Sequence, residues 1–538
     1  MQNSQEQPEQ SRHNQPKLLR WLQWLRPGAT HSAFSASLLL MAGSIMSSGV
    51  LALIRQKLIA HLFGATNATD AYIGAFELPD MVYYFLIGGV ASSTFVSLLS
   101  GYRERGEEAE GDRALSVILN TMILALGAAI LAAEFFAPWY VSVKFPHFDA
   151  PTAALCVSLT RILLPAQLFF FAGGVFGSRL MVRKVFLFQA LTPSIYNLGI
   201  IGGVLVLHSR IGVYSLAVGA LTGAFCGMFL LNIFGAWREG MRWQPVLDFR
   251  HPALLQWLKL AAPLMIGQSL TTWDQWIRTY FASQGVGDIT RLAFAKQLFN
   301  SPMNILGPAA GAASLPFFAS LYSKGKLDEF GQAVNRAVTR LMAASLLAAG
   351  WMIALAGPLV DVTLRGGHMD EASAQMTAWF FTIFCLSLFL WTSQNLYARA
   401  FFAAGNTFTP MLAGTIVTAV SIPVYWLLFH RLGVEGLAWA SNAGILLHTT
   451  ALVVLLQRNR LTPISGLEFG ELGRALLASI IGWGAITAGL RSLPTLHGHT
   501  QNLSAIAGAS AVWLGIVLVV LKATGSRLPG QILGKFAR

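Results

Sequence analysis

The chain has 538 residues, of which 54% are hydrophobic and only 11% charged, and its formal net charge is +13. A soluble domain carries about 25% charged residues, so the composition excludes an ordinary soluble protein. Apolar runs recur along the whole chain, and several reach the roughly 20 residues that cross about 30 Å of hydrocarbon. We therefore predict an all-α polytopic membrane protein.

Residues 1–32 are predicted to form a cytoplasmic segment before the first span. Within it, "PKLLRWLQWLRP" at 16–27 combines apolar side chains, cations and two tryptophans, a pattern typical of a helix in the membrane interface. A short polar tail with stop-transfer charges fits the same residues, and both interpretations stay open.

Hydropathy predicts about fourteen membrane-spanning helices. Their centres lie near residues 44, 85, 127, 167, 197, 223, 268, 306, 351, 388, 418, 445, 481 and 512. We assign the connections between successive spans alternately to the two sides of the membrane. About 25 lysines and arginines then lie on the same side as the N-terminus, whereas each loop on the opposite side holds about one cation. This asymmetry predicts that both termini are cytoplasmic. It also accounts for much of the positive charge without a nucleic-acid partner.

Similar segments indicate an internal repeat. The stretch "FGATNATDAYIGAF" at 63–76 resembles "FASQGVGDITRLAF" at 281–294, and "SLLSGYRERGE" at 97–107 resembles "PFFASLYSKGK" at 316–326. Because each copy holds an even number of spans, the two copies share one orientation and are related by a pseudo-two-fold axis along the membrane normal. Two such lobes with a cleft between them are typical of a transporter, with the substrate at the lobe interface.

The repeat predicts a division of the chain into two six-helix lobes and two extra C-terminal helices. The predicted parts are the N-lobe at 33–236, a cytoplasmic linker at 237–256, the C-lobe at 257–457, and spans 13 and 14 with a cytoplasmic tail at 458–538.

Acidic residues stand between two apolar runs in "FGATNATDAYIGAFELPD" at 63–80. On an undisturbed helix Asp70 and Glu77, two turns apart, lie on the same face. A polar stripe on an apolar span faces a cavity or a partner, because a charge facing lipid costs several kcal/mol. Alternatively Asp70 caps its own helix, directly after Thr69. We expect Asp70 to be partly structural and Glu77 to face the cleft.

More cations than acids lie within or at the edges of the spans. This bias suits an anionic cargo, and the fork geometry of arginine favours phosphate. Asp274 and Arg278 stand four residues apart, a spacing at which they can neutralise each other. The charged residues concerned are Arg55, Lys57, Arg161, Asp274, Arg278, Arg291, Lys296 and Asp361.

Several motifs resemble those of the MurJ/MviN family, the lipid II flippases of the multidrug/oligosaccharidyl-lipid/polysaccharide exporter superfamily. The stretch at 63–80 resembles that family's "FGAG-ATDAFF-AFKLPN", and "RAFFAAGNTFTP" at 399–410 resembles its "RAFYALKDTRTP". "LGVEGLAWA" at 432–440 and "LTPSIYNLG" at 191–199 also have counterparts there. The similarity covers nearly all of residues 33–520.

The resemblance implies a two-lobed exporter whose cationic central cavity binds the pyrophosphate and sugars of lipid II and flips it to the periplasmic leaflet by alternating access. It implies a role in peptidoglycan biosynthesis and cell shape, in the bacterial inner membrane. We expect a monomer that contacts anionic membrane lipids and draws on a coupling ion or the membrane potential. Arg55 matches the family's first-helix arginine and Asp70 its "ATDA" aspartate. The predicted substrate-binding residues are Arg55, Lys57, Asp70, Glu77, Arg278, Arg291 and Lys296.

Several charges of the family pattern are absent. Gly49 replaces the arginine six residues before Arg55, and Gln56 replaces the acid after it. Tyr83 and Tyr84 replace the paired arginines, Gly88 replaces a glutamate, and "KQLFN" at 296–300 replaces "DRLxE".

These departures leave other functions open. One is a flippase for another polyprenyl-pyrophosphate glycan, of the O-antigen or exopolysaccharide type; another is a non-transporting scaffold paralogue. A cation-coupled exporter of small amphiphiles would favour an acidic cavity, against the cationic bias. An enzyme is not expected, since the sequence shows no catalytic motif in a supportive context. No cofactor or metal is predicted either.

Overall fold

The computed structural model describes residues 31–87, 91–266, 270–492 and 499–530. These residues are overwhelmingly helical, and their only β-pairing is one bridge between Gly366 and Met369. The stretch 16–27, for which an interfacial helix was one interpretation, lies outside the described residues.

The first half of the chain forms the helices α2 to α11. They are α2 (His31–Phe63), α3 (Asn67–Gly74), α4 (Glu77–Ile87), α5 (Ala91–Glu104), α6 (Glu108–Lys144), α7 (Ala150–Leu163), α8 (Ala166–Val182), α9 (Leu187–Ile211), α10 (Tyr214–Gly223), the π-helix η1 (Ala224–Leu230) and α11 (Leu231–Arg238).

The second half forms α12 to α22. They are α12 (Pro252–Ile266), α13 (Leu270–Ala282), α14 (Asp288–Ser323), α15 (Leu327–Ala354), α16 (Ala356–Thr363), α17 (Glu371–Cys385), α18 (Leu388–Ala403), α19 (Phe408–Leu432), α20 (Glu435–Arg458), the 3₁₀ turn η2 (Ile464–Gly466), α21 (Phe469–Ser492) and α22 (His499–Ala523).

Within the described ranges, 9 helices are long and apolar enough to cross a membrane, or 10 when α17 and α18, bent by 43°, count as one span. They coincide with expected spans 3–6 and 9–14. The four other expected spans fall on α2, on α4 with α5, on α12 with α13, and on α14. The fold is the predicted all-α polytopic one, and about fourteen spans are consistent with it.

Matching helix ends confirm the repeat. Asp149 caps α7, accepting a hydrogen bond from the Thr152 amide at 3.3 Å, and Asp370 caps α17 through the Ser373 amide at 3.0 Å. Gly212 and Gly433 end α9 and α19 with φ of 57° and 62°, a backbone conformation that glycine adopts without strain. The two halves therefore repeat the same helix-cap chemistry at corresponding positions.

The buried apolar side chains show how the lobes meet. One cluster joins them, with Ala71 of the N-lobe and Ile289 of the C-lobe as members. A second, around Phe95, belongs to the first half and the start of α12, and a third, around Phe318, belongs to the C-lobe. The shared cluster lies at the ends of the helices away from the cation-rich loops. Among the residues that the structure describes, buried side chains of the two lobes pack together at that end and form separate clusters at the cation-rich end.

Helix α12 lies with the N-lobe, although the predicted division assigns residues from 257 onward to the C-lobe. The buried Trp257 donates a hydrogen bond from Nε1 to Thr94 Oγ1 at 3.1 Å and stacks on Phe95 with ring centroids 5.4 Å apart. Helix α13 instead packs against α19 and α20. The expected seventh span thus begins in one lobe and ends in the other.

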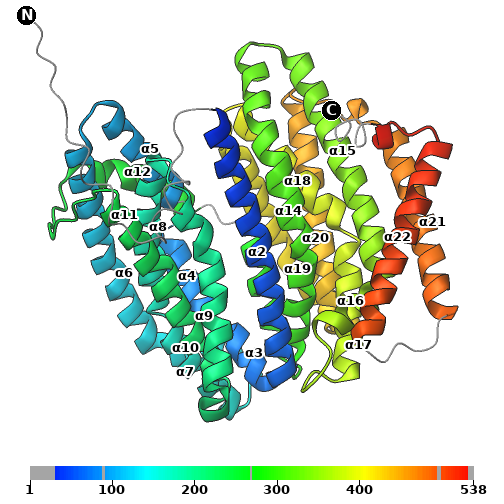
Figure 1. Ribbon diagram of the computed structural model, residues 1–538, viewed down its shortest axis with the longest axis horizontal. Helices are drawn as coiled ribbons and strands as arrows, with labels where there is room; N and C mark the ends of the chain where they lie inside the picture. Colours follow the sequence, from blue (N-terminus) through cyan, green and yellow to red (C-terminus); the bar gives the residue numbers. More distant parts are fainter. Residues whose placement is uncertain (1–30, 88–90, 267–269, 493–498, 531–538) are drawn as a thin grey trace, which may run out of the picture.

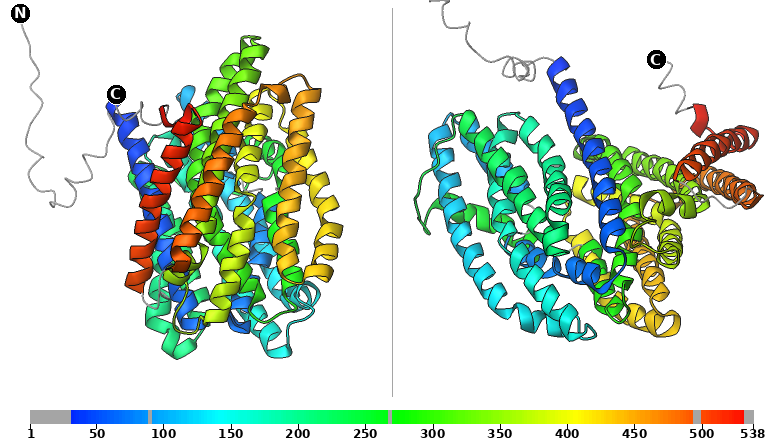
Figure 2. Two further views of the ribbon diagram at one scale, coloured as in Figure 1. Left: turned by 90° about the vertical axis from the view of Figure 1, so that its right-hand side faces the viewer. Right: turned by 60° about the horizontal axis from the view of Figure 1, so that its bottom comes forward.

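Helix α2 stands between the two lobes (Figure 1). The right-hand view of Figure 2, in which the bottom of the molecule is turned forward, shows the same placement, with the N-lobe helices on one side of α2 and the C-lobe helices on the other. Helices α21 and α22 lie on the outside of the C-lobe, where α21 packs on α15 and α22 on α16. Hydrogen bonds across the lobe junction join α2 and α3 to α14 and α4 to α13.

Candidate functional site at the lobe junction

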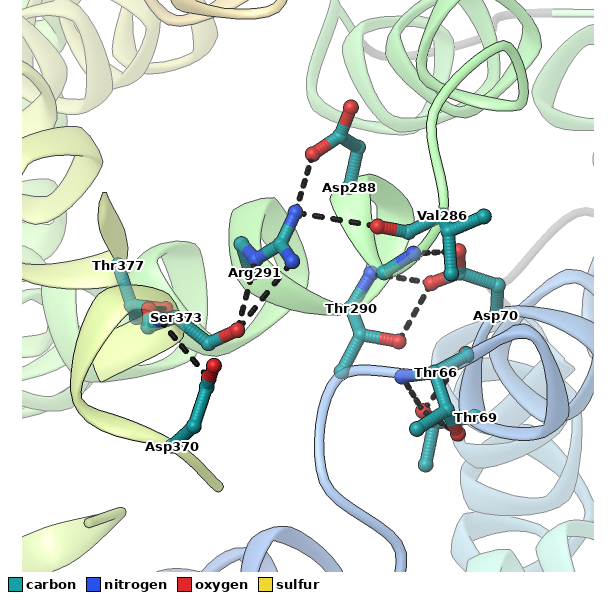
Figure 3. Close-up of polar contacts among 11 residues, drawn as sticks. Thr66, Thr69, Asp70, Val286, Asp288, Thr290, Arg291, Asp370, Ser373 and Thr377 are labelled. Carbon is teal, nitrogen blue, oxygen red and sulfur yellow. Dashed lines mark hydrogen bonds and ion pairs between the residues drawn. The ribbon is translucent and has the colours of Figure 1, made fainter. Parts of the chain in front are cut away.

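Asp70 joins the lobes by capping a helix of the other repeat (Figure 3). Its buried carboxylate accepts hydrogen bonds from the Gly287 amide at 2.6 Å, the Thr290 amide at 2.8 Å and the Thr290 hydroxyl at 2.6 Å. These amides begin α14 and have no partner within their own helix, and the positive end of a helix favours an anion. Asp70 does not cap its own helix, because Thr66 and Thr69 form the capping box of α3.

Two glycines let the lobe backbones touch around this contact. Gly287 has φ of 78°, and a Cβ there would lie 2.3 Å from the carbonyl oxygen of Ala65. Gly64 has φ of 64°, and a Cβ there would lie 2.3 Å from the carbonyl oxygen of His368. We call the contact between residues 64–70 and 287–290 the lobe seam. Its close backbone approach and its buried carboxylate hold this end of the junction shut.

Glu77 lies deeper in the junction and is fully buried. Lys144 of α6 places its Nζ 3.0 Å from Glu77 Oε2. From the other lobe, the Thr279 hydroxyl donates to Glu77 Oε1, and Lys144 in turn donates to the carbonyl oxygen of Trp276. A buried carboxylate needs such partners, and here they come from both lobes.

Arg291 lies beside the seam but within the C-lobe. It bonds Asp288 Oδ1 at 2.6 Å and the Ser373 hydroxyl at 3.2 Å, next to Asp370 (Figure 3). Asp370 stands in the loop before α17, outside the spans, where hydrogen bonds from the Ser373 hydroxyl and amide lower the pKa of its carboxyl. Arg291 therefore ties α14 to the start of α17.

A charged cluster lies farther along α13 and α14. Arg278 bonds Asp274 Oδ2 at 3.1 Å, Lys296 lies 3.7 Å from the same oxygen, and the Tyr425 hydroxyl donates to the other carboxylate oxygen. All four side chains are buried. The predicted pairing of Asp274 with Arg278 is present, and Lys296 adds a second cation, so the cluster carries a net positive charge.

A cavity of about 170 Å³ adjoins this cluster at the lobe junction. Arg278 and Lys296 belong to its wall, and Ile73 closes it from the N-lobe. The other polar residues of the wall are Gln275, Thr279, Gln297 and Asn300. Two cations and four uncharged hydrogen-bonding side chains suit an anionic group.

Arg55 and Lys57 lie on α2, apart from this cavity wall. Arg55 donates to Asn197 Oδ1 of α9 at 2.9 Å, within the N-lobe. Lys57 donates to the carbonyl oxygen of Val362 at 2.5 Å, and Gln56 to that of Phe294 at 3.3 Å, both in the C-lobe. Consecutive residues of α2 thus contact different lobes.

The structure brings some of the predicted site residues together and separates others. Arg278 and Lys296 share one cavity wall, and Glu77 adjoins it through Thr279. Asp70 and Arg291 lie at or beside the seam. Sequence reasoning missed the partners Lys144, Thr279, Thr290 and Tyr425. Only Lys144, the single cation of its loop, carried a signal in the sequence.

The family model for the lipid II flippase MurJ matches residues 59–502. The chain belongs to the MurJ family. Among curated MurJ proteins, the lipid II flippase of Burkholderia cenocepacia is 27% identical over 482 residues, which cover 85% of this chain and 92% of that protein. A probable lipid II flippase of Bdellovibrio bacteriovorus is 23% identical over 492 residues, covering 89% and 92%.

Two solved structures, one of MurJ and one of a MATE transporter, share the fold. A MurJ structure described as an inward closed conformation aligns with a TM-score of 0.75 at 22% identity, covering 90% of this chain and 99% of the other. An inward-facing multidrug MATE transporter aligns with a TM-score of 0.61 at 12% identity, covering 84% and 99%. At these identities the likeness concerns the fold alone. Membership of the MurJ family, together with the long apolar helices, makes the chain a multi-pass membrane protein of a transporter family.

Proposed function

We propose that the chain is a flippase that carries lipid II from the cytoplasmic to the periplasmic leaflet of the bacterial inner membrane. Membership of the MurJ family is the observation that carries this proposal. The cationic cavity at the lobe junction supports it, because Arg278 and Lys296 favour the negative charge of a pyrophosphate. Flipping would serve peptidoglycan synthesis and cell shape, and it needs transport rather than catalysis.

Alternating access gives the two ends of the junction opposite roles. Both termini and the cation-rich loops are assigned to the cytoplasm by their charge. The seam around Asp70 then closes the periplasmic end, and the separately packed end of the lobes faces the cytoplasm. Release of cargo outward would require Asp70 to leave the start of α14. We infer a monomer in contact with anionic lipids, powered by an ion gradient or the membrane potential.

A second candidate is a flippase for another polyprenyl-pyrophosphate glycan. It is favoured by the loss of family charges on spans 1 and 2, since Gly49 and Gln56 on span 1 and Tyr84 on span 2 stand where the family pattern has charged residues. A scaffold paralogue would tolerate the same losses.

Complementation tests these proposals. The resident lipid II flippase of a suitable bacterium is depleted, this chain is expressed, and lipid II at the outer leaflet is followed. Rescue by the wild type, together with failure of a membrane-inserted R278A variant, is expected. Failure of the wild-type chain to rescue growth, with normal membrane insertion, would overturn lipid II as the cargo. Rescue of a strain that lacks its O-antigen flippase, by expression of this chain, would then favour the second candidate.

A further inference from the structure

The ammonium group of Lys296 is enclosed by aromatic rings. Its Nζ lies 4.4 Å from the ring centroid of Trp391, 4.5 Å from that of Phe384 and 4.8 Å from that of Phe299. A cation within about 6 Å of a ring centroid is attracted by the negative face of the ring. Three rings around one ammonium form an aromatic cage.

Polar groups complete this cage. Asp274 Oδ2 lies 3.7 Å and Ser441 Oγ 3.3 Å from Lys296 Nζ, and Lys296 is buried with 7% exposure. We call the set Asp274, Phe299, Phe384, Trp391 and Ser441 the cation cage. Its members come from α13, α14, α17, α18 and α20, so that five helices of the C-lobe converge on the Lys296 ammonium. The Arg278 guanidinium lies at the edge of the cage, 5.5 Å from the ring centroid of Phe384.

The cage has the chemistry of a cation site and not that of an anion site. Ring faces and a carboxylate attract a positive charge and repel a phosphate. A buried ammonium is tolerated only with such compensation. The Arg278 guanidinium bonds Asp274 through Nη1 at 3.1 Å and carries further N–H donors. Contact with an anion in the adjoining cavity therefore suits Arg278, while Lys296 contributes a fixed positive charge.

We propose that Lys296 is a built-in cation: its ammonium occupies a monovalent-cation site of the C-lobe, so that this lobe takes no Na⁺, K⁺ or organic ammonium ion from solution. Removal of the lysine side chain then exposes a site for a small ammonium ion. The inference does not depend on which glycan is carried, because it concerns the charge balance of the C-lobe in any conformation that keeps Asp274 buried.

Chemical rescue of the purified full chain tests the proposal. The unfolding midpoints of the wild type and K296A are measured in detergent with NaCl, KCl, methylammonium chloride or N-methylglucamine chloride at one ionic strength. A ligand that binds only the folded state raises stability with its concentration. We expect a wild-type midpoint that is the same in all four salts. We expect K296A to start lower and to recover with increasing methylammonium until the effect saturates.

Two control variants separate a cage effect from a general one. K57A removes another junction lysine, which bonds the carbonyl oxygen of Val362 and has no cage, so methylammonium should leave it unchanged. The double variant D274N/K296A keeps the cavity but loses the carboxylate, and its rescue should weaken at least tenfold in methylammonium concentration.

The opposite results overturn the proposal. A saturable stabilisation of the wild type by Na⁺ or K⁺ that D274N abolishes would show that the C-lobe binds a solution cation. If methylammonium does not raise the unfolding midpoint of a folded K296A, the cage does not accept a cation from solution. If K296A does not accumulate, the wild-type salt series decides alone. An unfolding midpoint that is the same in all four salts supports the built-in cation, and a midpoint that rises saturably with Na⁺ or K⁺ contradicts it.

Discussion

Asp70 and Thr290 form a bond between the two lobes that neither helix could make alone. Asp70 Oδ1 accepts hydrogen bonds from both the amide and the hydroxyl of Thr290, at 2.8 and 2.6 Å, across 220 positions of sequence. The aspartate of one repeat thereby satisfies the first turn of α14 in the other repeat. A conformation with the seam open must leave these donors to water.

Replacement of Asp70 tests this bond. D70A leaves the Gly287 and Thr290 amides without their acceptor and should destabilise the closed seam by about 2 kcal/mol, the upper range for a helix cap. A lower unfolding midpoint and reduced flipping are the expected results. T290V keeps the amide bonds and loses one hydroxyl, so its effect should be smaller. Equal effects of D70A and T290V would contradict capping by the carboxylate.

Gly287 should tolerate no side chain. G287A places a Cβ 2.3 Å from the Ala65 carbonyl oxygen and also meets the cost of φ at 78°. G106A provides the matched control, because Gly106 has φ of 74° and no atom within 4 Å of its ideal Cβ. The control should lose about 1 kcal/mol from backbone strain alone. Unfolding midpoints measured side by side should show a clearly larger loss for G287A.

The Glu77–Lys144 pair should behave as a buried ion pair. E77Q or K144M leaves one buried partner without its counter-charge, which costs about 3–5 kcal/mol in comparable sites. The double variant E77Q/K144M removes both charges and should recover part of that loss. A double-mutant cycle on the free energy of unfolding measures the coupling. Additive single effects would argue that Lys144 and Glu77 act independently.

Arg55 is predicted to contact substrate phosphate. R55A should therefore abolish complementation while leaving the amount of membrane-inserted protein unchanged. N197A removes only the side chain that Arg55 Nη1 contacts at 2.9 Å, and should reduce function less. Normal growth on R55A would exclude the assignment.

The cap of α17 should weaken in acid. Hydrogen bonds from Ser373 lower the pKa of Asp370 below its ordinary 3.8. Stability from the ionised cap is therefore present above that ordinary value and is lost as the pH falls through the lowered pKa. D370N keeps a capping side chain without the titration. The midpoint difference between wild type and D370N should shrink below about pH 4, and a difference independent of pH would contradict this origin.

The membrane fold follows from local properties of the sequence. A spanning helix satisfies its own backbone hydrogen bonds and needs about 20 apolar residues, so hydropathy alone predicts about fourteen spans. The similarity of 63–76 to 281–294 predicts two repeated lobes, and the family motifs point to the MurJ family. Each of these signals is carried by residues close together in the chain.

The partners of the buried charges were decided by the tertiary structure alone. From the sequence, Asp70 could be the cap of its own helix, but in the structure its carboxylate oxygens accept hydrogen bonds from the start of α14. Lys296 could likewise be a phosphate ligand, but its ammonium lies among the rings of Trp391, Phe384 and Phe299. Likewise Trp257 places α12 in the N-lobe. Such contacts depend on which faces of distant helices meet, because a buried charge takes whatever compensating group the packing brings within reach, and residue spacing along one chain does not encode that.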